Sequence, residues 1–535
     1  MSIQLGPHLR SGRIRWAVGL VVASLAATLA VTVARPSAGA STAAVSVPSH
    51  SSVVAAMKRA ADYYRPNVRY PSGARNGWSW STYFQGLLAL YSTAGDQKYL
   101  TDARSWGQQT HWTLTTAEAD PDSAKAARPY YALRQLDPHV PLSTVDDRIA
   151  HDLTDQPASA YWWADALFMG LPNWPLWAAR TGDAAYLTKL DDVYAWTRDQ
   201  ANAHCPGAAP GGLYDADEHL WLRDCSFIDK PEPNGQKMFW SRGNGWVMAA
   251  MAQVLANLPA TQQAHAAPYR TMLQSMAPRI KDVQGADGFW RSSLLDPGAY
   301  PQPETSGTAL FTYALAYGID AGLLDRATYL PVVVRAWNGL AKKALQGSGF
   351  VSDCQPGAGA PGRSYVGTAP RARPTATSPG TLIADSPPFC VGAFLLAGSE
   401  VARLSPSLST GRHVTATAAQ AGNGPTRAVD GTMTTYWTAK GFPQSLVVDL
   451  GAARAIGNTM VVPYLDRPYR YRLDTSADAR HWRLIASRTG NTVGGSNFVT
   501  LPAPVSARYI RLTVTGQAGH GTGWAAIQEF GVYGP

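Results

Sequence analysis

Apolar residues recur at three- and four-residue steps over most of the chain, from about residue 53 to residue 403. This spacing places them on one face of an α-helix, so it predicts a series of amphipathic helices separated by Gly, Pro and Asp. The clearest of these segments are Tyr83–Tyr91, Tyr186–Arg198, Gly245–Leu258 and Thr308–Tyr317. Residues 53–405 are therefore predicted to form a mainly α domain.

A short pattern repeats within this helical region. Gly95–Leu100 (GDQKYL) recurs as Gly182–Leu187 (GDAAYL), and Asp325–Leu330 (DRATYL) is a looser copy. In such a pattern the Gly can end one helix in a left-handed conformation and the Asp can cap the next helix. Helical hairpins repeated over about 350 residues favour a closed helical toroid over a single bundle.

After about residue 410 the hydrophobic period changes to two. Alternating apolar and polar positions, bounded by turn residues, predict the strands Ser445–Leu450, Tyr469–Thr475, Trp482–Ser487 and Arg508–Thr515. Short strands over residues 411–535 predict a second domain, an antiparallel β-sandwich.

The N-terminal residues have the pattern of a secretory signal. Arg10, Arg13 and Arg15 precede an apolar run from Trp16 to Val33, and the small residues 38–40 (AGA) can form a cleavage site. We expect residues 1–40 to be a signal peptide, residues 41–52 a linker, and the mature protein to be secreted without membrane attachment. An uncleaved membrane anchor is the alternative, because the apolar run is near spanning length.

Charge is unevenly distributed along the chain. The formal net charge is +9, and residues 1–40 hold four Arg and no acid, which leaves +5 for the mature protein. Residues 411–535 alone hold twelve Arg or Lys against six Asp or Glu, a charge of +6. This favours an acidic polysaccharide as the partner of the second domain. The chain has no basic helix or arginine-rich arm, which argues against a nucleic acid partner.

Four cysteines, Cys205, Cys225, Cys354 and Cys390, follow the predicted signal. An even count in an exported protein is typical of disulfides, and proximity in sequence would pair Cys205 with Cys225 and Cys354 with Cys390. The other two connectivities, and four free thiols, stay open at this stage. No spacing among these cysteines resembles a zinc site.

The segment Phe239–Trp246 (FWSRGNGW) opens a predicted helix and is rich in groups that bind sugar acids. Arg242 offers a planar fork for a carboxylate, and Trp240 and Trp246 offer flat faces for a sugar ring. The structural alternative is a helix start with packed aromatic residues.

The segment Tyr161–Pro172 (YWWADALFMGLP) places Asp165 in an apolar, aromatic run. Loss of hydration there raises the pKa of a carboxyl and suits it to donate a proton near neutral pH. The alternative is that Asp165 only caps a helix.

Two further segments carry weaker signals. Asp120 and Asp122 (ADPDS) precede a predicted helix and could be caps or a second catalytic carboxylate. Glu304 lies in Pro303–Gly307 (PETSG), after the Trp- and Gly-rich segment Asp287–Pro297. Such polar residues bracketed by Trp, Gly and Pro could form the rim of a substrate pocket, or an ordinary surface loop.

Taken in order, these motifs resemble glycoside hydrolase family 105, the unsaturated rhamnogalacturonyl hydrolases, which are related to family 88. The resemblance extends from Trp78 to about Leu404 and is carried by NGWSWSTYFQGLLALY, WWADALFMGLP, LYDADEHLWLRD, KMFWSRGNGWVMAAMAQVL and DGFWRSSLLDP…YPQPETSGTALFTYALAYGI. It implies an (α/α)6 barrel with a central site. It implies an enzyme that removes 4-deoxy-4,5-unsaturated uronic acid from the non-reducing end of polysaccharide-lyase products, such as fragments of pectic rhamnogalacturonan, without a metal or cofactor.

The family resemblance also implies how the reaction proceeds. An Asp protonates C4 of the unsaturated sugar, water adds at C5, and the resulting hemiketal opens and releases the neighbouring sugar. This acid falls on Asp165, the carboxylate clamp on Arg242 and the stacking ring on Trp246. Trp78 and Trp163 match further aromatic positions of the site.

The family's second acid is best matched by Asp122. The match departs from the family at residues 126–130 (AARPY), where the family has a Gly-Gln pair. This departure leaves Asp120 as a competitor for the role of second acid.

Residues 411–535 resemble a discoidin-like (F5/8 type C) domain, similar to family 32 carbohydrate-binding modules. The motifs that carry this resemblance are Arg427–Gly431, Tyr436–Thr438, Ser445–Gly451, Ala507–Leu512 and Ile527–Phe530. Such modules often hold a structural calcium ion, for which Asp430 and Glu529 supply hard oxygen ligands. A capped turn and a surface acid without metal are the alternative.

Two other functions stay open from the sequence. The altered residues after Asp122 are compatible with a carbohydrate-binding protein that has lost its activity. A lyase or a conventional glycosidase on the same barrel is the second alternative. A conventional glycosidase needs two carboxylates at a defined separation, and only Asp165 is convincing from the sequence.

Overall fold

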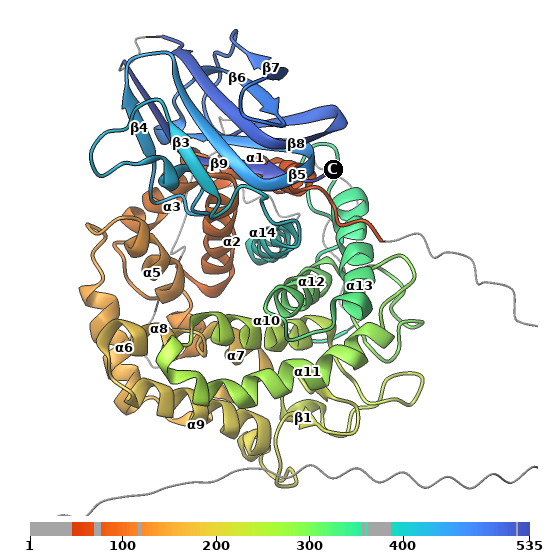
Figure 1. Cartoon of the computed structure of the whole chain (residues 1–535). Coiled ribbons are helices and arrows are strands. Elements are labelled where there is room, and N and C mark those ends of the chain that lie inside the picture. The colour runs from red at the N-terminus through yellow and green to blue at the C-terminus, as the bar shows by residue number, and fades with distance from the viewer. Residues whose placement is uncertain (1–44, 69–75, 116–119, 356–358, 362–386, 520–522) are drawn as a thin grey trace, which may run out of the picture. The chain divides into compact units, whose positions relative to one another are not determined.

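The computed structural model of the chain describes residues 45–68, 76–115, 120–355, 359–361, 387–519 and 523–535. Helices extend to Arg403 and a β-sheet domain begins at His413, as predicted (Figure 1). Residues 45–535 form one compact unit, and the predicted signal peptide lies outside the described residues. None of the described helices is both long and apolar enough to span a bilayer.

The helical part is an (α/α)6 barrel, in which outer and inner helices alternate along the chain (Figure 1). The outer helices are α1 (His50–Val68), α3 (Gln97–Gln109), α6 (Ser143–Asp155), α9 (Ala185–Asp199), α11 (Ala266–Asp282) and α13 (Arg326–Gly339). The inner positions belong to α2 (Trp78–Ala94), α5 (Ala127–Leu136), α7 (Ala164–Met169) with α8 (Asn173–Thr181), α10 (Ser241–Asn257), α12 (Thr305–Asp320) and α14 (Pro388–Arg403). Helix α1 begins at His50, so residues 50–52 are helical and do not belong to the predicted linker.

Three of the inner helices, α10, α12 and α14, are buried on almost every side. In α10 each residue from Ser241 to Val254 is buried, and α12 and α14 are buried in the same way. A helix that is apolar all round has no solvent-facing stripe and belongs inside a larger helical assembly. Two of these three helices, α10 and α12, correspond to the predicted segments Gly245–Leu258 and Thr308–Tyr317.

The ring closes where α2 packs against α14 through two glycines. A Cβ atom on Gly86 would lie 2.5 Å from the carbonyl oxygen of Gly392, and a Cβ atom on Gly392 would lie 2.3 Å from that of Thr82. Only glycine allows the two backbones to approach this closely. Substitution at either position would therefore push the first and last inner helices apart.

The predicted caps of the Gly-Asp repeat are only partly confirmed. Gly95 and Gly182 end α2 and α8 in the left-handed conformation, as expected, and Asp325 caps α13. Asp96 makes no capping bond, because its carboxylate instead pairs with the Lys58 ammonium at 2.7 Å.

The N-terminus of α3 is capped from the sheet domain. The backbone N–H of Gln97 lies 2.9 and 3.0 Å from the two carboxylate oxygens of Asp466. Ser496 of the same domain donates a hydrogen bond to Asp96 at 2.8 Å. A partner so distant in sequence is not visible in a local pattern, which is why the predicted cap was wrong.

The C-terminal domain is an antiparallel sandwich. Its strands are β3 (His413–Ala416), β4 (Trp437–Lys440), β5 (Gln444–Pro463), β6 (Tyr469–Ser476), β7 (Arg483–Arg488), β8 (Asn497–Gln517) and β9 (Trp524–Tyr533). Hydrogen bonding follows the order β4-β9-β5-β8-β6-β7, and β3 pairs with β5. The register of β5 against β8 shifts between Asp449 and Arg454, where the long strands bend. The four strands predicted from the sequence are all present.

Both predicted cysteine pairs are disulfides. Cys205 pairs with Cys225 and Cys354 with Cys390, with Cα atoms 5.9 and 6.3 Å apart. The structure thus selects one of the three connectivities that the sequence left open.

Candidate active site

Asp165 lies on the short helix α7, at the inner wall of the barrel. Trp163 precedes it in extended conformation at the N-cap position, and α7 packs against α10. Asp165 is 8% exposed, and its Oδ2 atom has no hydrogen-bond partner among the described residues. Burial raises the pKa of this carboxyl, although Arg223 and Arg242 oppose the shift. Asp165 is therefore suited to hold a proton at a pH where an exposed Asp has lost it.

The structure separates the two competing acids of the Asp120–Asp122 segment. Asp120 caps the short helix α4 (Pro121–Ala124), because its carboxylate accepts from the N–H groups of Asp122 and Ser123 at 3.3 and 3.0 Å. The Oδ1 atom of Asp122 is buried and has no hydrogen-bond partner among the described residues. Asp120 thus has a structural task, whereas Asp122 is available for another role.

Asp122 is electrostatically coupled to Asp165. Burial, followed by the negative charges of Asp120 and Asp165, raises the pKa of Asp122 to about 7. Arg223 opposes this shift. Burial therefore favours the protonated form of Asp122 near neutral pH, and the charges of Asp120 and Asp165 favour it further.

Arg223 is a site residue that the sequence reasoning missed. It follows the short strand β2 (Leu220–Trp221), which pairs with β1 (Tyr214–Asp215), and its carbonyl accepts from the Ala164 N–H at 2.8 Å. Its Nε atom lies 3.6 Å from Asp165 Oδ2, and its Nη1 atom lies 2.5 Å from Asp224 Oδ2. The signal was present in the LYDADEHLWLRD motif, whose Arg-Asp pair follows an apolar strand.

Trp162 and the Cys205–Cys225 disulfide lie next to Arg223 in space and in sequence, respectively. The guanidinium of Arg223 lies 5.7 Å from the centre of the Trp162 ring, and the His204 ring stacks on Trp162 with ring centres 4.2 Å apart. The Cys205–Cys225 disulfide joins the residue after His204 to the segment that carries Arg223. Trp162 is partly exposed, whereas Trp163, the aromatic residue expected in the site, is more fully buried beside it.

Arg242 is held at the start of α10 and is almost completely buried, with 1% exposure. Its Nη1 atom donates to the Gln355 carbonyl at 2.7 Å and to Ser306 Oγ at 3.3 Å. Its guanidinium lies 4.2 Å from the centre of the Trp240 ring and 4.8 Å from that of Phe389. Its charge lowers the pKa of Asp165, but the guanidinium has little surface to offer a ligand.

The aromatic residues named from the sequence occupy two different environments. Trp240 and Trp246 are buried: the Trp240 Nε1 atom donates to Gln355 Oε1 at 2.7 Å, and the Trp246 ring packs 4.4 Å from Phe168. Trp78 is partly exposed and lies edge-on to Trp246, with ring centres 6.4 Å apart. The expectation that Trp240 and Trp246 present open faces is therefore not met, because both rings are already covered by protein atoms.

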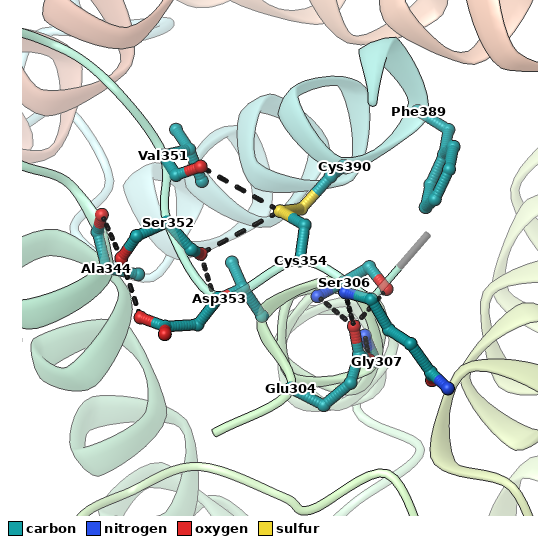
Figure 2. The surroundings of a disulfide bond; sticks show 12 residues. Glu304, Ser306, Gly307, Ala344, Val351, Ser352, Asp353, Cys354, Phe389 and Cys390 are labelled. Atoms are coloured by element: carbon teal, nitrogen blue, oxygen red, sulfur yellow. Dashed lines mark hydrogen bonds between the residues drawn. A yellow bond between two sulfur atoms is a disulfide. The ribbon is translucent and has the colours of Figure 1, made fainter. Parts of the chain in front are cut away.

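The expectation that Glu304 lines a pocket rim is wrong. Glu304 has 0% exposure and caps α12, where its carboxylate accepts from the N–H groups of Ser306 and Gly307 at 3.2 and 2.6 Å (Figure 2). It also accepts from the Gln355 N–H at 3.2 Å. A helix start supplies several unpaired N–H groups, and these attract a carboxylate more strongly than a solvated rim position does.

The second disulfide joins the segments that surround Arg242. Figure 2 shows Cys354 bonded to Cys390, next to Phe389 at the start of α14 and close to the Glu304 cap. Gln355 follows Cys354 directly and contacts both Arg242 and Trp240. Gln355 is thus a second residue that sequence reasoning missed, because nothing in a Cys-Gln pair indicates such contacts.

The segment that departs from the family pattern, residues 126–130, covers the N-cap and the first turn of α5. Lys125 precedes it and is buried, with its Nζ atom 2.6 Å from Gln85 Oε1 and 3.8 Å from the centre of the Phe168 ring. Burial lowers the pKa of Lys125 well below its ordinary value, and Arg128 lowers it further. Phe168 in turn packs against Trp246, so a single ring connects Lys125 to the aromatic residues of α10.

In the sheet domain, the two candidate calcium ligands flank one turn. Asp430 accepts from Thr435 Oγ1 at 2.6 Å, and the Gly431 N–H donates to Glu529 at 3.1 Å. Burial, together with the negative charge of Asp430, raises the pKa of Glu529 to about 8, although the hydrogen bond from the Gly431 N–H opposes the shift. No described part of the chain gathers three His, Cys, Asp or Glu side chains that could hold a metal. Calcium would fit only with additional ligands such as backbone carbonyls, and it stays a prediction.

Comparison with known proteins agrees with this architecture. Residues 50–405 match the family described as Glycosyl Hydrolase Family 88, and residues 413–530 match the F5/8 type C domain. The barrel and its buried acids thus define a glycoside hydrolase joined to a discoidin-like module. The chain belongs to glycosyl hydrolase family 88, the relative of family 105 that the motifs indicated.

One characterised relative and two solved structures are similar over the barrel. An unsaturated 3S-rhamnoglycuronyl hydrolase from Formosa agariphila is 32% identical over 378 residues, 66% of this chain and 92% of the relative. The structure of a glycosyl hydrolase family 88 protein from Bacteroides vulgatus has 29% identity and a TM-score of 0.55, covering 66% of this chain and 99% of its own. A structure that bears the name of a polysaccharide lyase has 28% identity and a TM-score of 0.57, and the match covers 66% of this chain and 98% of that structure's chain.

Proposed function

We propose that this enzyme removes 4-deoxy-4,5-unsaturated uronic acid from the non-reducing end of acidic oligosaccharides, with Asp165 as the proton donor. The observation that carries this proposal is the buried Asp165 carboxyl, which has an unpartnered oxygen and lies next to Arg223 and the second acid, Asp122. An enol ether needs a proton donor near neutral pH and an anion-binding group beside it. The site offers both.

In the proposed reaction, the Asp165 carboxyl transfers its proton to C4, and positive charge develops at C5 and the ring oxygen. The Asp165 carboxylate then accepts a proton from the water that attacks C5. The product is a hemiketal at C5, which opens to a ketone and releases the neighbouring sugar from C1. Each step uses protein groups and water, so the proposal needs no metal or cofactor.

We assign the uronate carboxylate to Arg223. The sequence resemblance placed this task on Arg242, but Arg242 is bonded to Gln355 and Ser306 and has almost no exposed surface. The side chain of Arg223 is 23% exposed and its Nε atom lacks a hydrogen bond. A guanidinium binds a carboxylate through two parallel N–H groups, which suits Arg223. Arg242 would then influence the reaction only through its positive charge, which lowers the pKa of Asp165.

The name of the Formosa relative supports an unsaturated uronate linked to rhamnose as the substrate class. The C-terminal module would hold the parent polysaccharide, as its F5/8 type C match supports. We further propose that the protein is secreted, because two disulfides need an oxidising compartment and the N-terminal sequence has the pattern of a signal peptide.

The test is ultraviolet absorbance of the conjugated double bond during incubation with lyase-generated oligosaccharides. A hydrolase makes the absorbance fall, and Asp165→Asn abolishes the fall. The similar structure named as a polysaccharide lyase favours a second candidate, a lyase activity on the same barrel. A lyase creates the double bond, so the absorbance of an intact polysaccharide would rise. A rise with polymer and no fall with oligosaccharide would replace the proposed function by the lyase.

A further inference from the structure

The outward surface of β6 and β8 carries a group of arginines that the hydrolase chemistry does not use. We call it the basic face; it comprises Arg470, Arg472, Asp474, Trp482 and Arg511. Side chains alternate along a strand, and Tyr471 and Leu473 are in the core of the sandwich while Arg470 and Arg472 are exposed. The strand register places Asp474 directly opposite Arg511. The three guanidinium groups therefore lie on one side of one sheet.

Positive charge exceeds negative charge on this face. Arg472 Nη2 lies 3.4 Å from Asp474 Oδ1, and Arg511 Nη2 lies 3.3 Å from Asp474 Oδ2. Asp474 is 3% exposed, so its charge is covered by the two guanidinium groups that share it. Three cations with one buried anion leave a surplus of positive charge at the surface. This surplus contributes to the +6 charge of residues 411–535.

The basic face also offers flat surface and hydroxyl groups. Trp482 precedes β7, is half-buried, and has the guanidinium of Arg511 4.3 Å from its ring centre. Thr513 lies opposite Arg472, and its hydroxyl is 2.9 Å from that of Ser445 on the next strand. Guanidinium groups, an aromatic ring and two hydroxyl groups on one side of the sheet can bind the carboxylates, the ring faces and the hydroxyls of a sugar-acid chain.

We propose that the basic face binds the uronate chain of an acidic polysaccharide. The charge complementarity of the face selects an anionic polymer, and the choice of a uronate polymer rests on the proposed function of the barrel. Binding there would hold the enzyme on polymer that is being cut into substrates. The ligand contacts would be Arg470 and Arg472, whereas Arg511 keeps Trp482 and Asp474 in place.

The test uses the full chain and polygalacturonate in affinity electrophoresis or calorimetry. Arg470→Gln with Arg472→Gln should weaken binding about tenfold, which corresponds to about 1.4 kcal/mol for two lost charge-assisted contacts. Arg412→Gln with Arg454→Gln is the matched control, because both residues are exposed in the same domain and the same charge is lost. The control should bind like the wild type, and raising the salt concentration should weaken wild-type binding.

Equal weakening in both double variants would overturn the proposal, since net charge and not the basic face would then be responsible. Tighter binding of duplex DNA, neutral dextran or a sulfated polymer without uronate would overturn the choice of ligand. Turnover of an unsaturated disaccharide in the same variants should equal that of the wild type. That readout separates the two hypotheses, because a failure of the proposed function would abolish turnover in the wild type while leaving polymer binding measurable.

Discussion

The Nε atom of Arg223 lies 3.6 Å from the Oδ2 atom of Asp165, and neither atom has a hydrogen-bond partner among the described residues. A buried carboxyl oxygen and a buried guanidinium N–H that lack hydrogen bonds cost free energy unless a ligand supplies the missing partners. An acid and a cation separated by 3.6 Å can both contact the same small ligand group.

Asp165→Asn should reduce turnover of an unsaturated oligosaccharide by at least about 10²- to 10⁴-fold, because the amide cannot donate and take back the proton. The measurement is the initial rate of absorbance decay. Asp282→Asn on the outer helix α11 serves as the control, since Asp282 is exposed and remote from the site residues. Wild-type activity in Asp165→Asn would refute the assigned acid.

Arg223→Gln should move the pH profile upward. Arg223 lowers the pKa of both Asp165 and Asp122, so its removal raises both values. The rate falls as pH rises through the pKa of the acid that must be protonated. This falling part of the pH–rate profile should therefore lie at higher pH in the variant. KM should also rise, by about tenfold or more if a carboxylate contact is lost. Arg223→Lys retains the charge, so the falling part of its pH–rate profile should stay where it is in the wild type. This variant should lose only the pair of parallel hydrogen bonds to the uronate carboxylate.

Asp122→Asn should stabilise the fold at alkaline pH while reducing activity. A carboxyl whose folded-state pKa is about 7, against 3.8 in the unfolded chain, makes folding less favourable as pH rises between these values. The variant should therefore gain on the order of 1–3 kcal/mol relative to the wild type at pH 8, and little at pH 4. Thermal unfolding at both pH values measures this difference.

Asp120→Ala is the matched control for Asp122→Asn. It removes the cap of α4, which should cost about 1 kcal/mol at pH 4, and it also removes a negative charge that raises the pKa of Asp122, so the cost should be smaller at pH 8. If Asp122→Asn destabilised the fold like Asp120→Ala, the buried, protonated state of Asp122 would be excluded.

Removing the second disulfide should loosen Arg242. Cys354→Ser with Cys390→Ser opens a loop of 36 residues, which costs roughly 4 kcal/mol by the chain-entropy relation. Gln355 would lose its covalent neighbour, so Arg242 and Trp240 should lose order and turnover should fall beyond the effect of stability. Gln355→Leu, which keeps the disulfide but removes the Trp240 bond, should lower turnover without the large loss of stability. Unchanged turnover in both variants at a temperature where they are folded would show that these contacts do not affect the site.

Calcium should raise the unfolding temperature of the module if Asp430 and Glu529 bind it. The two acids repel, and a divalent cation would allow Glu529 to ionise below its raised pKa of about 8. A chelator should then lower the unfolding temperature, and Glu529→Gln should abolish the response. An unfolding temperature indifferent to both calcium and chelator would leave Glu529 as a buried acid that bonds the Gly431 N–H.

Much of the fold followed from local patterns. Helical periodicity and the period-two segments placed the barrel and the sandwich correctly, because each pattern records which face of a single element is buried. Asp165 could be found in the same way, since an acid in an otherwise apolar run has a raised pKa wherever that run is buried. The pairing of the cysteines agreed with their proximity in sequence, although the sequence did not exclude the alternatives.

The sequence by itself thus determined the elements and the helical and sheet domains, and it indicated that the carboxyl of Asp165 is buried, because these features depend on residues close together in the chain. The tertiary structure decided which polar side chains already have protein partners. Asp120 and Glu304 accept hydrogen bonds from the N–H groups at helix starts. Arg242 is bonded to Gln355, and Asp96 is paired with Lys58. It also brought Arg223 to Asp165 across 58 residues of chain. A polar side chain in a motif can bind a ligand or form hydrogen bonds with the protein backbone. Only the distances to its partners in the folded protein distinguish these two roles.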